Sequence, residues 1–230
     1  YLDHSEWLVR CDAAEALGAI AGHHNELALE ALTRCLQDES DFVRQAAVQG
    51  LASIASRAGG SSCMARALIA CLGDEDCTVR RCAVDALDSI VERGNQDAVA
   101  ALCAHVVTSD SSVRCEGLTA LAAVSGEGDE RAIEAIIACL TDPLKYVRRS
   151  AIEALTTVAE HGNAKAFAAL VTCLGDRDEC VRRAVAEAIA SVAEGGDENA
   201  RSLLSVCLED PDDYVRCCAA EVLKTASNNA

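Results

Sequence analysis

Apolar residues recur along the whole chain with the spacing of a helix and with a fixed longer period. In residues 145–159, KYVRRSAIEALTTVA, the apolar positions Val147, Ala151, Leu155 and Val158 form one stripe along a helix. The same pattern occurs seven times, and its first valine is Val9, Val43, Val79, Val113, Val147, Val181 and Val215. Neighbouring valines are 34 residues apart, except for one step of 36. A period of this length is typical of a solenoid, in which helical repeats stack in a row.

A second helix is predicted between successive copies of this pattern. We call it helix A, and we call the helix with the recurring valine helix B. Helix A is expected at residues 25–36, 62–72, 96–107, 129–140, 164–174 and 198–208. In the fifth of these segments, Phe167, Leu170 and Leu174 lie on one face. The predicted fold is therefore all-α, a right-handed α-solenoid of stacked antiparallel helix pairs that forms a single array over residues 1–230.

The period divides this array into a partial first repeat, residues 1–24, and six full repeats. The full repeats are expected at 25–60, 61–94, 95–128, 129–162, 163–196 and 197–230. Leu2 aligns with Leu36, so the chain is expected to open at the last turn of a helix A. Because a solenoid needs capped ends, we expect a longer parent array or a partner over the ends.

Turn residues mark the ends of the predicted helices. Asp142-Pro143 and Asp210-Pro211 predict an N-cap aspartate followed by a proline at the first helical position. A glycine follows each helix B from the first to the sixth repeat, where a left-handed conformation would end the helix. These glycines are Gly22, Gly59, Gly94, Gly126, Gly162 and Gly195.

Composition and charge narrow the class of protein and of partner. Apolar residues make up 51% of the chain, but charges interrupt every helix, so no stretch approaches the roughly 18 residues that a membrane span requires. The formal charge of −17 would repel a phosphate backbone, which disfavours nucleic acid and favours basic proteins or peptides as partners. Alternatively, the carboxylates only keep an Ala-rich array in solution.

The 14 cysteines include five at one repeat position, directly before a leucine. These five are Cys35, Cys71, Cys139, Cys173 and Cys207. Equivalent positions in stacked helices lie about 8–10 Å apart, which is beyond the Cα separation of a disulfide. We therefore expect small apolar core residues in a reducing intracellular compartment, the cytoplasm or an organelle interior. No CxxC pair is present, so no metal site is predicted.

The repeats resemble a known family. The patterns of tetratricopeptide and ankyrin repeats are absent. The pattern that recurs is instead an Asp, then Val-Arg five and six residues later, then Ala and Ala-Leu at helical spacing. This pattern resembles HEAT repeats, most closely the short HEAT-like type named after phycobilisome lyases, and the resemblance covers essentially the whole chain.

The resemblance implies a structural Asp/Arg ladder along the seam between repeats. Its expected aspartates are Asp38, Asp74, Asp142, Asp176 and Asp210. Its expected arginines are Arg10, Arg44, Arg80, Arg114, Arg148, Arg182 and Arg216. Thr108 and His4 stand at the Asp position of their repeats, so the ladder is expected to break there and the stacking to be impaired. Guanidinium groups between carboxylates in such a seam are expected to be structural.

In HEAT-like arrays the B helices line the concave surface, and this implies where a partner would bind. Large apolar residues form an interrupted row near the start of helix B, namely Trp7, Leu8, Phe42, Tyr146 and Tyr214. Exposed aromatic side chains are common anchors in interfaces. Alternatively, these residues close the helical hairpin by packing on helix A.

Two further rows of helix B complete the candidate binding surface. One contains the second residue after the valine: Cys11, Gln45, Arg81, Cys115, Arg149, Arg183 and Cys217. The other contains the sixth: Glu15, Gln49, Asp85, Thr119, Glu153, Glu187 and Glu221. The basic and acidic residues of these rows predict a ridge for a mixed-charge helix or peptide. Alternatively, Arg149 with Glu153 and Arg183 with Glu187 are simple contacts between neighbouring turns.

No catalytic constellation is found in the sequence. Some HEAT-like proteins are iron enzymes with His-Glu dipeptides, and this chain has none. His105 stands at the core cysteine position and is expected to be packed. We therefore expect no enzyme and no cofactor, but a protein-binding scaffold or assembly subunit. The resemblance alone implies the alternative, a bilin lyase subunit or chromophore chaperone; the charge of −17 disfavours a HEAT-like DNA-repair protein.

Overall fold

The computed structural model describes residues 1–22, 25–58, 62–108, 110–192 and 198–228. All regular structure within these ranges is helical, as predicted. The A helices are α2 (Glu26–Cys35), α4 (Ser62–Cys71), α6 (Gln96–Thr108), α8 (Glu130–Cys139), α10 (Ala164–Thr172, followed by the 3₁₀ turn Cys173–Gly175) and α12 (Glu198–Cys207). The B helices are α1 (Trp7–Ile20), α3 (Asp41–Ala58), α5 (Cys77–Ile90), α7 (Ser111–Val124), α9 (Lys145–Val158), α11 (Glu179–Val192) and α13 (Asp213–Asn228).

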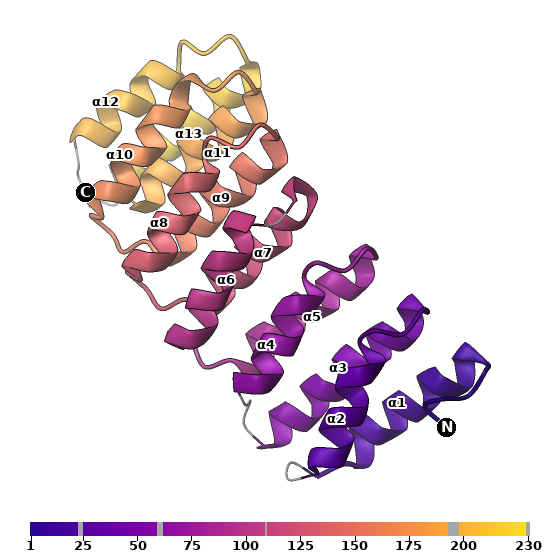
Figure 1. The fold of residues 1–230 in the computed structure, drawn as a ribbon. Helices are drawn as coiled ribbons and strands as arrows, with labels where there is room; N and C mark the ends of the chain where they lie inside the picture. The colour runs from indigo at the N-terminus through magenta and orange to yellow at the C-terminus, as the bar shows by residue number, and fades with distance from the viewer. Residues whose placement is uncertain (23–24, 59–61, 109, 193–197, 229–230) are drawn as a thin grey trace.

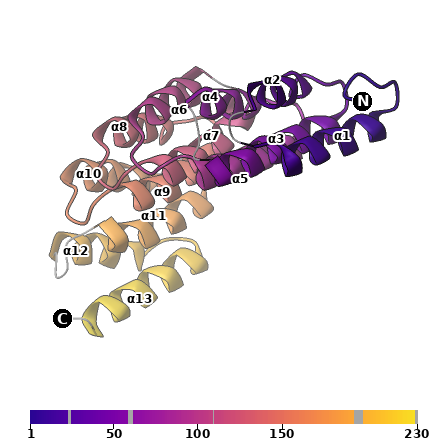
Figure 2. The ribbon, with the colours of Figure 1, turned by 90° about the horizontal axis from the view of Figure 1, so that it is seen from below.

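The helices form two layers that curve together. Successive helix pairs lie side by side from the N-terminus to the C-terminus (Figure 1). Seen along the layers, the A helices follow the outer side of the curve and the B helices follow the inner side (Figure 2). The fold is therefore an α-solenoid whose concave face is made by the B helices, in agreement with the predicted class.

A continuous core lies between the two layers. The A helices contribute one large apolar residue per repeat at the same position, namely Leu32, Leu68, Leu102, Ile136, Leu170 and Leu204. The B helices contribute Leu51, Leu87, Leu121, Leu155 and Ile189 at the equivalent depth. All of these side chains are buried. Because each helix pair is too small to bury its apolar face alone, neighbouring repeats complete the core of one another.

The predicted N-caps are wrong by two residues. Helix α9 begins at Lys145, so Pro143 precedes the helix instead of occupying its first position. The Oδ1 atom of Asp142 accepts a hydrogen bond from the backbone N–H of Leu144 at 2.8 Å, which closes a turn before the helix. The same turn is made by Asp38, Asp74, Asp176 and Asp210.

The side chains that do cap the B helices stand at the residue before the helix. Asp76 accepts from the backbone N–H groups of Thr78 and Val79, at 2.7 and 3.1 Å. Asp178 and Asp212 act in the same way at the starts of α11 and α13. Two aspartates thus share the loop, and the first is bonded to an arginine of the preceding repeat, described below. The second supplies the cap.

Glycines after the B helices have a different role from the one predicted. Helix α5 ends at Ile90 and is followed by the extended residue Val91. The left-handed residue Gly94 (φ 82°) comes three positions after Val91. The backbone N–H of Gly94 donates to the carbonyl of Val124, the last residue of α7, at 2.8 Å. Left-handed Gly128 and Gly162 make the same contact to Val158 and Val192. These glycines bind the next repeat rather than ending their own helix.

The other glycines that were predicted to be left-handed do not show this conformation or lie outside the described residues. In the fourth repeat the left-handed residue is Gly128 and not the predicted Gly126. Gly22 does not have a positive φ either. Gly59 and Gly195 lie outside the described residues.

Candidate functional site

Bidentate ion pairs join successive repeats along the edge where each B helix begins. The Nε and Nη2 atoms of Arg148 donate to the two carboxylate oxygens of Asp176, both at 2.7 Å. The same geometry joins Arg10 to Asp38, Arg44 to Asp74 and Arg182 to Asp210. Each arginine thus binds the aspartate of the following repeat.

Each of these arginines also binds its own repeat. Nη1 of Arg148 donates to the backbone carbonyl of Asp142 at 2.9 Å, and Nη1 of Arg44 donates to that of Asp38 at 2.9 Å. The hydrogen bond from Arg10 holds the pKa of Asp38 below its ordinary value. Arg10, Arg44 and Arg148 are buried and Arg182 is half-buried, and all four hold neighbouring repeats together through charge-assisted hydrogen bonds.

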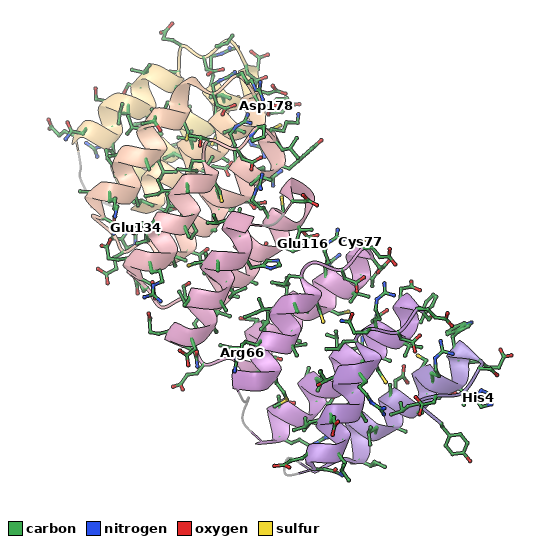
Figure 3. The ribbon with its side chains drawn as sticks, in the orientation of Figure 1. His4, Arg66, Cys77, Glu116, Glu134 and Asp178 are labelled. Atoms are coloured by element: carbon green, nitrogen blue, oxygen red, sulfur yellow. The ribbon has the colours of Figure 1, made fainter. Side chains whose placement is uncertain are left out.

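The seam between α5 and α7 keeps an ion pair although Thr108 occupies the Asp position. Nε of Arg80 donates to Oε1 of Glu116 at 3.1 Å. Glu116 lies where α7 borders α5 (Figure 3). The bidentate aspartate pair is therefore missing from this seam, as expected, but a carboxylate on helix B takes its place and keeps Arg80 in an ion pair. The remaining arginines also have carboxylate partners: Arg114 pairs with Asp142, and Arg216 with Asp213 of its own helix.

The large apolar row is exposed. The exposed fraction is 42% for Trp7, 53% for Phe42, 67% for Tyr146 and 72% for Tyr214. Leu8 is also exposed, at 55%. The alternative that these side chains pack on helix A is not what the structure shows. Trp7 instead stacks on Phe42 across two B helices, with ring centroids 4.9 Å apart.

The charged rows of helix B are exposed on the same layer, and two of their pairs are bonded within one helix. Arg149 and Glu153 form an ion pair at 2.8 Å, and Arg183 and Glu187 form one at 3.6 Å. Such contacts between neighbouring turns of one helix were predicted from the sequence as the alternative to a binding ridge, and the structure shows them. The remaining charged members, Arg81, Asp85, Glu15 and Glu221, are exposed, as is Gln49, and Gln45 is half-buried.

A shallow pocket of about 280 Å³ lies between α9 and α11 on this face. Its rim contains both ion pairs, Arg149–Glu153 and Arg183–Glu187, together with Cys180. The buried residues Ile152, Ala184 and Ala188 also line it. The pocket was not predicted, because the sequence pattern does not show where small side chains on one helix face a neighbouring helix.

The five cysteines of the repeat position are buried, as predicted. The Sγ of Cys71 donates to the carbonyl of Ala67 at 3.3 Å, and burial raises the pKa of Cys71 to about 11. The pKa of Cys139 is raised to about 11 by the same cause. Such thiols are protonated at neutral pH, so they act as small core residues. The reducing compartment stays a prediction.

Groups suited to metal binding are sparse in the described part of the chain. Asp178, Glu179 and Cys180 have ligand atoms close together at the start of α11 (Figure 3 labels Asp178). Asp178 is, however, bonded to Lys145 at 2.9 Å and to the backbone N–H of Cys180. The half-buried His105 has its pKa lowered by desolvation, as a packed histidine does. In the described ranges no helix is both long and apolar enough to cross a membrane.

A family model described as HEAT repeats matches residues 1–57, 65–156 and 133–224. This chain belongs to the HEAT-repeat family. The stacked helix pairs of the structure agree with this membership. No curated protein sequence matches this HEAT-repeat chain.

Solved structures support the same fold. The complex of CpcE and CpcF of phycocyanin lyase from Nostoc sp. PCC7120 is similar, with 22% identity and a TM-score of 0.61 over 70% of this chain and 99% of that one. The archaeal HEAT-like repeats protein from Thermococcus onnurineus NA1 has 14% identity and a TM-score of 0.55, over 98% of each chain. An engineered protein has 24% identity and a TM-score of 0.53, over 87% of this chain and 98% of that one.

Proposed function

We propose that this HEAT-repeat protein is a non-enzymatic scaffold that binds a protein or peptide partner through its concave B layer. The observation that supports the proposal is the exposed row of large apolar side chains at the starts of the B helices. Trp7, Phe42, Tyr146 and Tyr214 are all exposed there, although aromatic residues make up only 3% of the chain. Exposed apolar groups of this kind are typical of interaction surfaces.

The charged rows fit the same function. Arg149 and Arg183 each use Nε toward a glutamate of the same helix, and about half of each side chain is exposed. A guanidinium group has five N–H donors, so each arginine has further donors with which to bind a partner carboxylate or carbonyl. The pocket between α9 and α11 places these donors beside small side chains, where a partner backbone has room to approach.

Affinity capture from a native extract, followed by mass spectrometry, tests the proposal. The test variant carries Tyr146, Arg149, Arg183 and Tyr214 changed to Ala. A matched control carries Leu27→Ala and Val206→Ala, which remove exposed apolar side chains from the A helices α2 and α12. We expect a partner that the wild type and the control retain and that the test variant loses. A partner lost only with the control would move the binding surface to the A layer and overturn the proposal.

The alternative of a bilin lyase subunit or chromophore chaperone has its own test. The similarity to the phycocyanin lyase complex concerns the fold alone. We expect no spectral shift and no covalent adduct when the purified chain is incubated with a free bilin. A covalent adduct would overturn the non-enzymatic proposal, and a spectral shift without an adduct would favour the chromophore chaperone over the protein-binding scaffold.

A further inference from the structure

Trp7, Leu8 and Phe42 form an exposed apolar patch at the N-terminal ends of α1 and α3, and we call it the Trp7 patch. The rings of Trp7 and Phe42 are 4.9 Å apart with planes inclined by 27°, so they stack while both side chains stay at the surface. The chain contains a single tryptophan and two phenylalanines. Its only tryptophan is therefore used at the surface rather than in the core, which indicates a binding role.

The backbone that carries the two rings is held rigidly. Helices α1 and α3 approach so closely that a Cβ atom on Gly18 would lie 2.4 Å from the Cα of Gly50. Nearer the patch, Cys11 donates to the backbone carbonyl of Phe42 at 3.7 Å, and the buried Arg10 is bound to Asp38. Side chains on such a fixed base lose little conformational freedom when a ligand binds.

The charges around the Trp7 patch are negative. Glu6 and Asp41 directly precede Trp7 and Phe42, and Glu15 lies two turns further along the same stripe of α1. The arginines nearest in sequence, Arg10 and Arg44, are buried and bound to carboxylates of the following repeats. A cation that reaches the patch therefore meets aromatic rings and carboxylates without a competing exposed guanidinium on these two helix starts.

We infer that the Trp7 patch binds an arginine or lysine side chain of a basic peptide segment. The cationic group would lie against the stacked rings, because aromatic faces attract cations and tryptophan does so most strongly. The hydrocarbon stem would lie against Leu8, as long cationic side chains do on apolar surfaces. The net charge of −17 favours the approach of a basic segment. The inference rests on the proposed function and names the chemistry of the partner at one end of the concave face.

Intrinsic fluorescence provides a direct test, because Trp7 is the only tryptophan. The probe is a peptide of alternating Arg and Gly, and the comparison peptide has citrulline in place of Arg, which keeps the shape and removes the charge. We expect a saturable change in Trp7 emission with the Arg peptide at low salt, loss of binding as salt rises, and at least about fivefold weaker binding of the citrulline peptide. Equal binding of both peptides would overturn the inference in favour of an apolar or hydrogen-bonding occupant.

Two variants separate the patch from the general charge of the protein. Phe42→Leu keeps an apolar side chain and removes the ring, and we expect it to weaken binding of the Arg peptide by about two- to fivefold. Val206→Ala is the matched control: it removes an exposed apolar side chain from the A helix α12, at the other end of the array and outside the concave layer, and should leave the affinity unchanged. Equal weakening by both, or no change with Phe42→Leu, would overturn the inference. Emission that changes with protein concentration alone would show that a second copy covers the patch, which overturns it as well.

These outcomes are independent of the capture experiment. A partner that depends on Tyr146, Arg149, Arg183 and Tyr214, together with no response of Trp7 to the Arg peptide, would leave the scaffold proposal intact and remove only the inference. A response of Trp7 to the Arg peptide without any captured partner would keep the Trp7 patch as a cation-binding site and would remove the scaffold proposal.

Discussion

The Nε atom of Arg80 donates to Oε1 of Glu116 at 3.1 Å, and this ion pair replaces the loop aspartate that the repeat at Thr108 lacks. Elsewhere along the seam the arginine binds both oxygens of an aspartate, as Arg148 binds Asp176. In the described part of the chain, Oε2 of Glu116 has no hydrogen-bond partner. The replacement therefore preserves the charge pairing but makes fewer hydrogen bonds than the pair it substitutes.

Removing the two carboxylates should destabilise the fold unequally. We expect Asp176→Ala to lower the free energy of unfolding by about 3–5 kcal/mol, because it leaves the buried Arg148 without its bidentate partner. Glu116→Ala should cost about 1.5–3 kcal/mol, since one charge-assisted hydrogen bond is lost. Urea denaturation followed by circular dichroism measures both.

A second substitution provides the control for this comparison. Thr108→Asp in the Glu116→Ala background should restore stability, because it returns the aspartate of the repeat pattern. A Glu116 variant as damaging as the Asp176 variant, or no recovery with Thr108→Asp, would contradict this account of the seam.

The course of this seam shows what the sequence could and could not predict. The helices were predicted to within about two residues because apolar spacing is set by burial, which repeats with every unit. The arginine–aspartate pairs were implied by resemblance. Glu116 was missed because its position in helix B carries Ala46, Cys82 and Ser150 in other repeats and no repeated chemistry. The signal that could have revealed it is an acid in helix B in the repeat that lacks the loop aspartate.

Two further differences from the sequence-based expectations have physical causes: competing hydrogen-bond partners of one carboxylate, and a ring contact between two repeats. Asp142 was predicted as an N-cap because it precedes a proline, but its carboxylate already binds the arginine of the preceding repeat and the Leu144 N–H. The stack of Trp7 on Phe42 joins residues at different positions of their repeats, two and one before the valine. The sequence places both residues near the starts of their B helices. It does not predict their contact, because they do not stand at equivalent repeat positions.

Stability should fall in acid because the ladder carboxylates have lowered pKa values. Hydrogen bonds from Arg10 and Arg182 hold the pKa of Asp38 and of Asp210 below the ordinary value of about 3.9. The unfolded chain then binds protons more readily than the folded one. The contribution is fully present above the unfolded pKa, near pH 4, and is lost as the pH falls through the lower folded value. Asp210→Asn should be less stable at pH 7 and should lose less on acidification. Parallel pH profiles for the variant and the wild type, from urea midpoints, would contradict this.

Two neighbouring positions of α9 test the assignment of its faces. Leu155 is fully buried between the layers, so Leu155→Ala should cost about 2–5 kcal/mol by opening a cavity. Glu153 is exposed, and its bonds among the described residues are to its own helix, so Glu153→Ala should change stability by less than about 0.5 kcal/mol. Thermal and urea denaturation compare the two. Similar costs would show that the buried and concave faces are assigned wrongly.

Thiol reactivity should divide the cysteines by burial. Cys71 and Cys139, whose pKa values are raised to about 11 by burial, should resist iodoacetamide in the folded protein at pH 8. The exposed Cys77, Cys180 and Cys217 should be alkylated. Peptide mapping by mass spectrometry after a short reaction measures the difference. In concentrated urea all 14 cysteines should react, which controls for peptide recovery. Early labelling of Cys71 in the folded protein would place it outside the core.

The close approach of α1 to α3 depends on two glycines. A Cβ atom at Gly18 would lie 2.4 Å from the backbone of Gly50, so Gly18→Ala must push the two helices apart. We expect a loss of about 1–3 kcal/mol in the free energy of unfolding, as for other overpacked sites. Because Trp7 and Phe42 stack across the same two helices, the emission of Trp7 should shift as well. Gly22→Ala is the matched control, since within the described residues nothing lies within 4 Å of a Cβ there and its φ is not positive. A Gly18 variant as stable as the Gly22 variant, with unchanged emission, would show that α1 and α3 do not meet at these glycines.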